Sequence, residues 1–176
     1  MRIAALLGVS AAVAALGALF YAFPGSSEDA RARHVREMKL REIDQRFTQG
    51  TAMLHAKRYD HALTAFHRVL QLDPALPEAH VNAGFALLGL ERHEAARGFF
   101  AAAIELRPGQ VNAYYGLALV LEKMNDLPGA RGAMRTYVHL APRDDPYRRK
   151  AEAALWEWEA VKEDASPPGR RGSGRR

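Results

Sequence analysis

The chain has 176 residues, a formal net charge of +5 and 48% hydrophobic residues, which suits a single domain with short additional segments. It contains no cysteine, so a disulfide framework, a thiolate zinc site, a cysteine nucleophile and lipidation at a cysteine are all excluded. The positive charge is concentrated at the end of the chain, where residues 166–176 hold four arginines and no acid. The basic balance therefore does not indicate a nucleic-acid-binding domain.

Residues 3–23 carry no charge and are apolar or small throughout. At about 1.5 Å per residue, a helix of this length can span a hydrocarbon core of about 30 Å. The run is longer than the apolar region of a signal peptide, and its aromatic end at Tyr21 and Phe23 makes a poor cleavage site. We predict a transmembrane signal-anchor over residues 1–25, in preference to a cleaved signal peptide or a buried core helix.

The charges that flank this segment leave its orientation open. The arginines that follow it would place the rest of the chain in the cytoplasm by the positive-inside rule. The short, positively charged N-terminus favours the opposite orientation. We therefore expect a single-pass protein of a bacterial inner membrane, with its domain in the periplasm.

A helix is expected from about residue 28 to 56, with Ser27 as its N-cap and Glu28 and Asp29 in its first turn. We interpret residues 26–42 as a charged helical stalk. A coiled-coil contact is the alternative, but the apolar seam is too short for sustained heptads.

A period of 34 residues follows, over the units 43–76, 77–110 and 111–144. Counted from the start of each unit, the same residue types return at the same repeat positions. Position 8 holds a small residue (Gly50, Gly84 and Ala118), and so does position 20 (Ala62, Ala96 and Ala130). Position 24 holds a bulky residue (Phe66, Phe100 and Met134), and position 32 holds proline (Pro74, Pro108 and Pro142). The small residues let two antiparallel helices approach closely, and proline ends the second helix of each unit.

These residues resemble the tetratricopeptide repeat, a helix–turn–helix unit of 34 residues. Unit one departs from the family, which often has an aromatic residue at position 4 and leucine at position 7, where this chain has Arg46 and Gln49. The resemblance implies an all-α fold: a right-handed α-solenoid of three helical hairpins with a C-terminal capping helix, preceded by the transmembrane helix.

The repeat helices are expected at about 59–72, 77–90, 93–106, 111–124 and 127–140. Asp144, Asp145 and Pro146 then predict the start of a capping helix at residue 146, within the segment 145–164. This helix would cover the open end of the last repeat, as a solenoid needs for solubility. Residues 165–176 are expected to be a disordered basic tail, which could touch anionic lipid or nucleic acid by charge alone.

By resemblance to the family, the first helix of each unit lines a concave groove at positions 2, 5, 9 and 12. Most of these positions are apolar or aromatic, which is typical of a surface that binds another polypeptide. The predicted groove residues are Phe47, Thr51, Leu54, Val81, Phe85, Leu88, Asn112, Tyr115, Leu119 and Glu122. The alternative for any one of them is a place in the hairpin core.

Some members of the family hold acidic chaperone tails with a cluster of Lys, Arg and Asn, of which only Asn82 is present in this chain. We therefore predict no such clamp. His55, His61 and His67 are six residues apart, a spacing that spreads them around a helix. No metalloprotease, nucleophile-elbow or phosphate-loop motif occurs, so no enzymatic activity, metal or cofactor is expected.

Two functions remain open on the sequence. The first is a membrane-anchored scaffold or assembly factor that binds a partner polypeptide in the groove. The second is a permanent accessory subunit of a membrane complex, with the transmembrane helix packed against other subunits through small residues such as Gly8 and Gly17. Specific nucleic-acid binding is not expected in either case.

Overall fold

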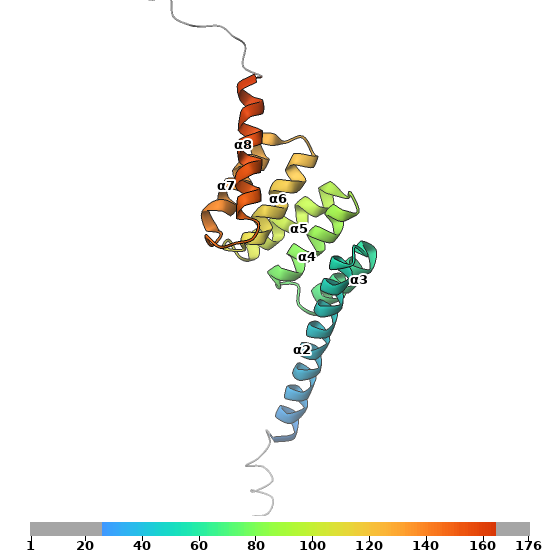
Figure 1. Ribbon diagram of the computed structural model, residues 1–176. Coiled ribbons are helices and arrows are strands. Elements are labelled where there is room, and N and C mark those ends of the chain that lie inside the picture. The colour runs from blue at the N-terminus through green and yellow to red at the C-terminus, as the bar shows by residue number, and fades with distance from the viewer. Residues whose placement is uncertain (1–25, 165–176) are drawn as a thin grey trace, which may run out of the picture. The chain divides into compact units, whose positions relative to one another are not determined.

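The computed structural model describes residues 26–164, which form seven helices and no strand (Figure 1). The helices are α2 (Ser26–His55), α3 (Tyr59–Leu72), α4 (Pro77–Gly89), α5 (His93–Leu106), α6 (Val111–Lys123), α7 (Leu127–Leu140) and α8 (Arg148–Asp164). The predicted all-α class is confirmed, and each repeat helix begins and ends within a residue of its expected limits.

The chain divides after Glu42 into two compact units. In the first unit the structure describes only residues 26–42 of α2, a charged helical segment with Glu28 and Asp29 in its first turn. Ser27 lies inside the helix, which already includes Ser26, so it is not the N-cap that we predicted. Val35 and Met38 are 67% and 52% exposed, and they do not belong to any buried core cluster.

The second unit consists of three helical hairpins followed by α8. The first hairpin pairs residues 43–55 of α2 with α3, since the Phe47 and Phe66 rings meet edge-on at 5.7 Å. The second pairs α4 with α5, and the third pairs α6 with α7. Successive hairpins are joined by the packing of α3 against α4 and of α5 against α6. This regular stacking is the solenoid arrangement expected from the 34-residue period.

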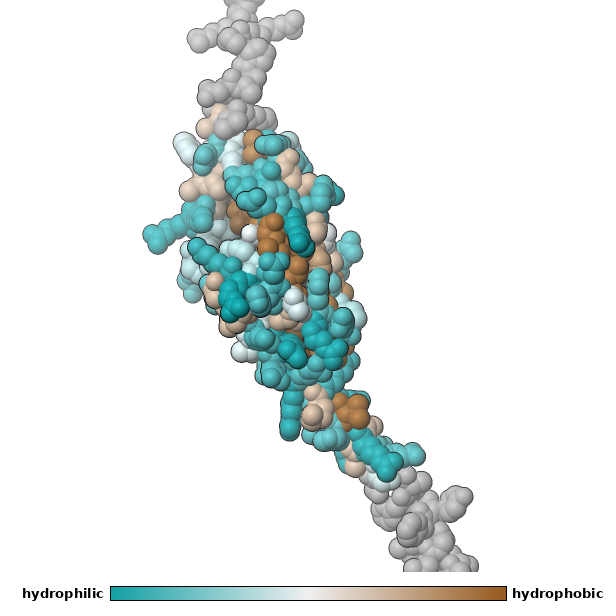
Figure 2. Space-filling view, turned by 90° about the vertical axis from the view of Figure 1, so that its right-hand side faces the viewer, coloured by the Kyte–Doolittle hydropathy of each residue, from teal (hydrophilic) through white to brown (hydrophobic). Residues whose placement is uncertain are grey.

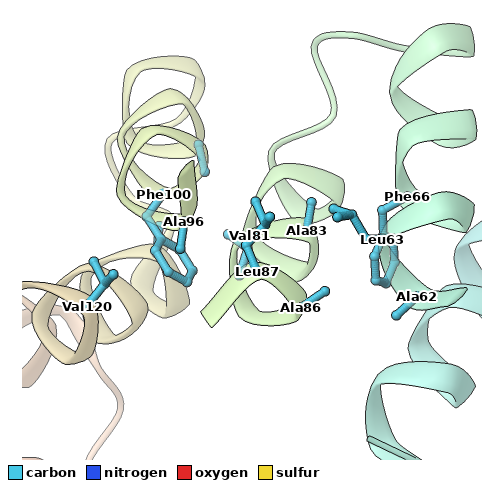
Figure 3. Packing of buried hydrophobic residues seen from close by; sticks show 12 residues of the cluster. Ala62, Leu63, Phe66, Val81, Ala83, Ala86, Leu87, Ala96, Phe100 and Val120 are labelled. Atoms are coloured by element: carbon cyan, nitrogen blue, oxygen red, sulfur yellow. The ribbon is translucent and has the colours of Figure 1, made fainter. Parts of the chain in front are cut away.

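Buried side chains from neighbouring hairpins form one cluster that spans α3 to α6 (Figure 3). Leu63 and Phe66 of α3 lie opposite Ala83 and Ala86 of α4 in this view, and Phe100 continues the layer from α5. A second cluster joins α6, α7 and α8 around Tyr137, Met134 and Trp158, of which Tyr137 and Met134 are 1% exposed. Burial of these apolar surfaces supplies most of the stabilisation at about 25 cal/mol per Å².

In two of the three hairpins, a glycine on the first helix packs closely against a phenylalanine ring on the second. A Cβ atom built on Gly50 would lie 2.7 Å from Phe66, and one built on Gly84 would lie 2.8 Å from Phe100. Glycine at position 8 is therefore required by the phenylalanine at position 24. The third hairpin has Ala118 and Met134 at these positions. Alanine is larger than glycine, and methionine is more flexible than phenylalanine, so the two can still pack.

The turn inside each hairpin uses the same left-handed residue at repeat position 15. Lys57, Glu91 and Asn125 have φ of 57°, 59° and 60°. The residue that follows each of them donates its N–H to the carbonyl five residues back, for example from Arg92 to Leu87 at 2.9 Å. This is a Schellman motif, which ends the first helix and lets the chain reverse.

Two expectations from the sequence need correction. The capping helix begins at Arg148, because Pro146 and Tyr147 form a turn in which the Tyr147 N–H donates to Asp145 Oδ1 at 2.8 Å. Within residues 26–164 no helix combines the length and the apolar composition needed to cross a membrane. This finding contradicts the predicted single-pass membrane localisation, and residues 3–23, on which that prediction rested, lie outside the described residues, as does the predicted tail.

Replacing Gly84 by Ala should lower the free energy of unfolding by about 1–3 kcal/mol, because the added methyl would overlap the buried Phe100 ring. Chemical denaturation followed by circular dichroism measures the change. The matched control is Gly98→Ala on α5, where nothing lies within 4 Å of the added atom. The better helix propensity of alanine should raise stability there by about 0.5–1 kcal/mol. Equal effects at both positions would show that the close approach does not constrain the hairpin.

Replacing Glu91 by Gly should raise the free energy of unfolding by about 0.5–1 kcal/mol, because glycine adopts a positive φ without steric cost. The next residue provides the control. Arg92 has φ of −86°, so Arg92→Gly should lower stability through the added freedom of the unfolded chain. Thermal unfolding of both variants makes the comparison, and a stabilising Arg92→Gly would contradict the explanation.

Candidate functional site

The predicted groove residues lie on the first helix of each hairpin: α2 beyond residue 42, α4 and α6. Their exposure divides them into two groups. Val81 and Tyr115 are 3% and 8% exposed and belong to the buried clusters, so they offer little surface to a partner. The others are half-buried or exposed, namely Phe47, Thr51, Leu54, Phe85, Leu88, Asn112, Leu119 and Glu122.

Each half-buried phenylalanine of this set packs against the ring of a fully buried phenylalanine. Phe85 meets Phe100 edge-on at 5.0 Å, as Phe47 meets Phe66 in the preceding hairpin. Phe85 also packs against both core clusters, so it connects the second repeat to the third. Thr51 donates its hydroxyl to the Phe47 carbonyl at 2.9 Å, which uses that donor within the helix. The face therefore presents rigid apolar side chains with few free polar groups.

The capping helix and the turn before it engage the third repeat. Trp158 of α8 donates its indole N–H to Glu122 Oε1 at 3.1 Å. Tyr147 lies 5.6 Å from the Tyr115 ring, which also contacts Tyr137 at 5.0 Å. Two of the predicted groove residues, Tyr115 and Glu122, thus already contact α8 or the turn that precedes it.

Two acids on the first helices of the second and third hairpins, Glu78 and Glu122, have partners. Glu78 accepts a hydrogen bond from Arg107, which joins the start of α4 to the loop after α5. Glu122 is bound by Trp158 as described above. These two carboxylates are therefore already engaged within the chain.

The end of the last repeat holds a small polar network. Tyr137 donates its hydroxyl to Asp145, and burial followed by this hydrogen bond raises the pKa of Tyr137. Burial is also the main cause of the raised pKa of Tyr115. Arg148 donates to the Val138 and Ala141 carbonyls, both at 2.8 Å, and so satisfies the C-terminal end of α7. These contacts attach α8 to the last hairpin.

The histidines do not assemble into a site. His67 stacks on Phe99 at 5.9 Å, and His61 lies 3.3 Å from the Arg58 guanidinium. Among residues 26–164, no group of three His, Asp or Glu side chains is placed to hold a metal ion. The absence of an enzymatic activity stays a prediction.

The surface shown in Figure 2 carries hydrophobic side chains in separate areas among hydrophilic ones. Sequence reasoning did not find a cavity of about 690 Å³ between α2 and α3. Arg46 and Gln49, the two departures of the first unit from the family pattern, both line it. Those departures were the only signal for this cavity in the sequence.

Two family models match the chain, both described as tetratricopeptide repeat, over residues 47–111 and 87–155. Together they span more than half of the chain and follow the three hairpins. The chain belongs to the tetratricopeptide-repeat family. No curated protein sequence matches it.

Several solved structures share the fold. The Sgt2 repeat domain of Aspergillus fumigatus is 24% identical, with a TM-score of 0.64 over 77% of this chain and 91% of that one. The first repeat domain of Spaghetti (RPAP3), bound to the HSP90 peptide SRMEEVD, is 17% identical, with a TM-score of 0.64 over 70% and 97%. The chaperone SycD of Yersinia enterocolitica, with a peptide of the translocator YopD, is 12% identical, with a TM-score of 0.63 over 68% and 94%.

Replacing Trp158 by Ala should lower the free energy of unfolding by about 3–5 kcal/mol, because this 4% exposed side chain fills the core beneath α8. The same helix offers a matched control. Trp156 is 78% exposed, so Trp156→Ala should change stability by less than about 0.5 kcal/mol. Denaturant unfolding of the two variants tests the comparison, and similar losses at both positions would contradict the docking of α8.

Proposed function

We propose that the tetratricopeptide-repeat domain is a protein–protein interaction scaffold that holds a segment of a partner polypeptide against α2, α4 and α6. The observation that carries the proposal is the recurrence of half-buried apolar side chains on these three helices. Leu54, Leu88 and Leu119 all remain partly exposed although each packs against a core cluster. Rigid apolar side chains of this kind gain most when a partner removes their remaining surface from water.

The contacts of α8 and of the turn before it limit which part of the groove face a partner can use. Tyr115 and Glu122 already contact Tyr147 and Trp158. We therefore centre the binding face on Phe47 and Leu54 of the first repeat and on Phe85 and Leu88 of the second. Asn112, which is exposed at the start of α6, marks its edge in the third repeat.

The solved relatives support a peptide as the ligand. The Spaghetti domain holds an HSP90 peptide and SycD holds a peptide of a translocator, on the same fold as this chain. The chemistry of the ligand differs in our proposal, because only Asn82 matches the Lys, Arg and Asn cluster that grips acidic chaperone tails. We expect the partner segment to contact this face through apolar anchor residues.

The accessory-subunit alternative depends on a helix packed inside a membrane. The residues that would form this helix lie outside the described part of the chain, and no observation on residues 26–164 favours that role over the scaffold.

Peptides selected from a random display library against the purified full-length chain would test the scaffold. We expect the selected peptides to share two or three apolar residues, and Leu88→Ala or Asn112→Trp to weaken their binding about tenfold in fluorescence anisotropy. Asn112→Trp adds bulk at an exposed residue and leaves the core in place.

The control is Glu105→Trp, which adds the same bulk at an exposed residue of α5, a second helix of a hairpin. Its affinity should stay within about twofold of the original chain. Equal losses for Asn112→Trp and Glu105→Trp, or none for either, would place the binding face elsewhere. Thermal unfolding of each variant confirms that the fold is retained.

A further inference from the structure

The 34-residue period continues past the third hairpin into α8. A fourth unit in the same phase would begin at residue 145, which places α8 (Arg148–Asp164) at positions 4 to 20 of that unit. α8 packs against α7, just as α4 packs against α3 and α6 packs against α5. It therefore occupies the place of a first helix in the stack, although the sequence predicted only a cap.

The hydrogen bonds at position 4 support this assignment. In the second and third units the side chain at position 4 donates to the carbonyl of the proline at position 32 of the preceding unit, at 2.8 Å from His80 and at 3.0 Å from Tyr114. Arg148 holds position 4 of the fourth unit, and its guanidinium donates to the Ala141 carbonyl, one residue before the proline, at 2.8 Å. The loop that leads into α8 is thus attached in the same way as the loops between the repeats.

The buried and exposed sides of α8 also follow the repeat. Ala151 stands at position 7 and is fully buried, like Ala83 at the same position of α4. The groove positions 5, 9 and 12 then fall at Arg149, Ala153 and Trp156, which are all exposed. At about 100° per residue, these three lie within about 60° of one another and roughly opposite Ala151.

Trp156 continues the series of apolar side chains at position 12. Leu54 and Leu88 hold this position in the first two repeats and are half-buried, whereas Trp156 is 78% exposed. Glu122 holds it in the third repeat, where it is bonded by Trp158. A tryptophan with so much surface in water adds little to the stability of the fold, but tryptophan is among the side chains that contribute most to binding at interfaces.

We infer that the groove face extends onto α8, where Trp156 and Ala153 bind an apolar side chain of the partner segment. The inference rests on the proposed function, because it assigns the far end of the same groove. Ala153 lies one turn before Trp156 on the same side of α8, and its small side chain leaves the surface beside the tryptophan open. The occupant is a partner polypeptide in an extended form, which continues from α4 across α6.

The spacing of the helices sets the length of that segment. Packed helices lie about 8–10 Å apart, so the two steps from α4 to α8 cover roughly 16–20 Å. An extended chain advances about 3.3 Å per residue, which gives about five or six residues between an anchor on Leu88 and an anchor on Trp156. Leu119 of α6 is half-buried and comes between these two in the order of the helices. The partner segment therefore presents apolar residues at both ends of such a stretch.

The test uses a tryptophan-free peptide from the display selection against the full-length chain. Trp156→Ala should weaken its binding about tenfold in fluorescence anisotropy. Thermal unfolding should stay unchanged, because the side chain is exposed. The matched control is Leu106→Ala, which truncates a 44% exposed apolar side chain at the end of α5, a second helix. Its affinity should stay within about twofold of the original, and equal losses for the two variants would overturn the inference.

Acrylamide quenching of tryptophan fluorescence gives a direct readout of the same contact. The chain has two tryptophans, and Trp158 is only 4% exposed, so the quencher acts mainly on Trp156 in the free chain. Saturation with the peptide should lower the quenching constant toward that of a buried tryptophan, because the peptide covers the indole. The Trp156→Phe variant, which retains only Trp158, should show no such change.

The outcomes separate this inference from the proposed function. Binding that Leu88→Ala weakens and Trp156→Ala does not, with unchanged quenching, would end the groove before α8 and overturn the inference alone. Failure to select any peptide, or binding that Leu88→Ala leaves unchanged, would overturn the proposed groove face and this extension with it. Quenching that falls as the free chain is concentrated would assign the surface around Trp156 to a second copy of the chain, and a partner segment would be the wrong occupant.

Discussion

The close approach of a glycine to a phenylalanine ring is the contact on which the stacked hairpins depend. Gly50 and Gly84 leave room for Phe66 and Phe100, and Gly116 of the next hairpin also lies so close to the Phe100 ring that a side chain there would overlap it. A single ring thus sets the spacing within its own hairpin and to the following one. Interiors at crystal-like density tolerate little adjustment of such a contact. The regular position of α4 and α6, and with it the recurrence of apolar groups on their outer faces, follows from this packing.

The repeat period made most of the fold predictable. Proline at position 32 cannot continue a helix, and the structure ends α3, α5 and α7 two residues before it. The turns inside the hairpins were less visible, because Lys57 and Glu91 are poor residues for a positive φ and only Asn125 is a common one. Packing between the two helices of a hairpin fixes the turn, and the local preference of the residue is overridden.

The groove face was only partly predictable, for reasons that lie in long-range contacts. The repeat position indicates the side of a helix that a residue faces, but it does not say how far neighbours cover it. Val81 and Tyr115, which the repeat positions assigned to the groove, are buried. The hydrogen bond from Trp158 to Glu122 joins residues 36 apart in sequence, and no local pattern indicates it. Which of the predicted groove residues a partner touches stays part of the proposal.

The two ends of the repeat stack deal with their exposed surfaces in different ways. A terminal repeat needs a polar outer face, and mixed charges meet that need without electrostatic cost. The C-terminal end does this with α8, whose Arg148 pairs with Glu152 and whose Glu159 pairs with Arg135. The first hairpin does so with Arg, Gln, His and Thr side chains around the cavity between α2 and α3. Polar side chains at this end thus come from the helices of the hairpin itself, whereas at the other end an added helix supplies them.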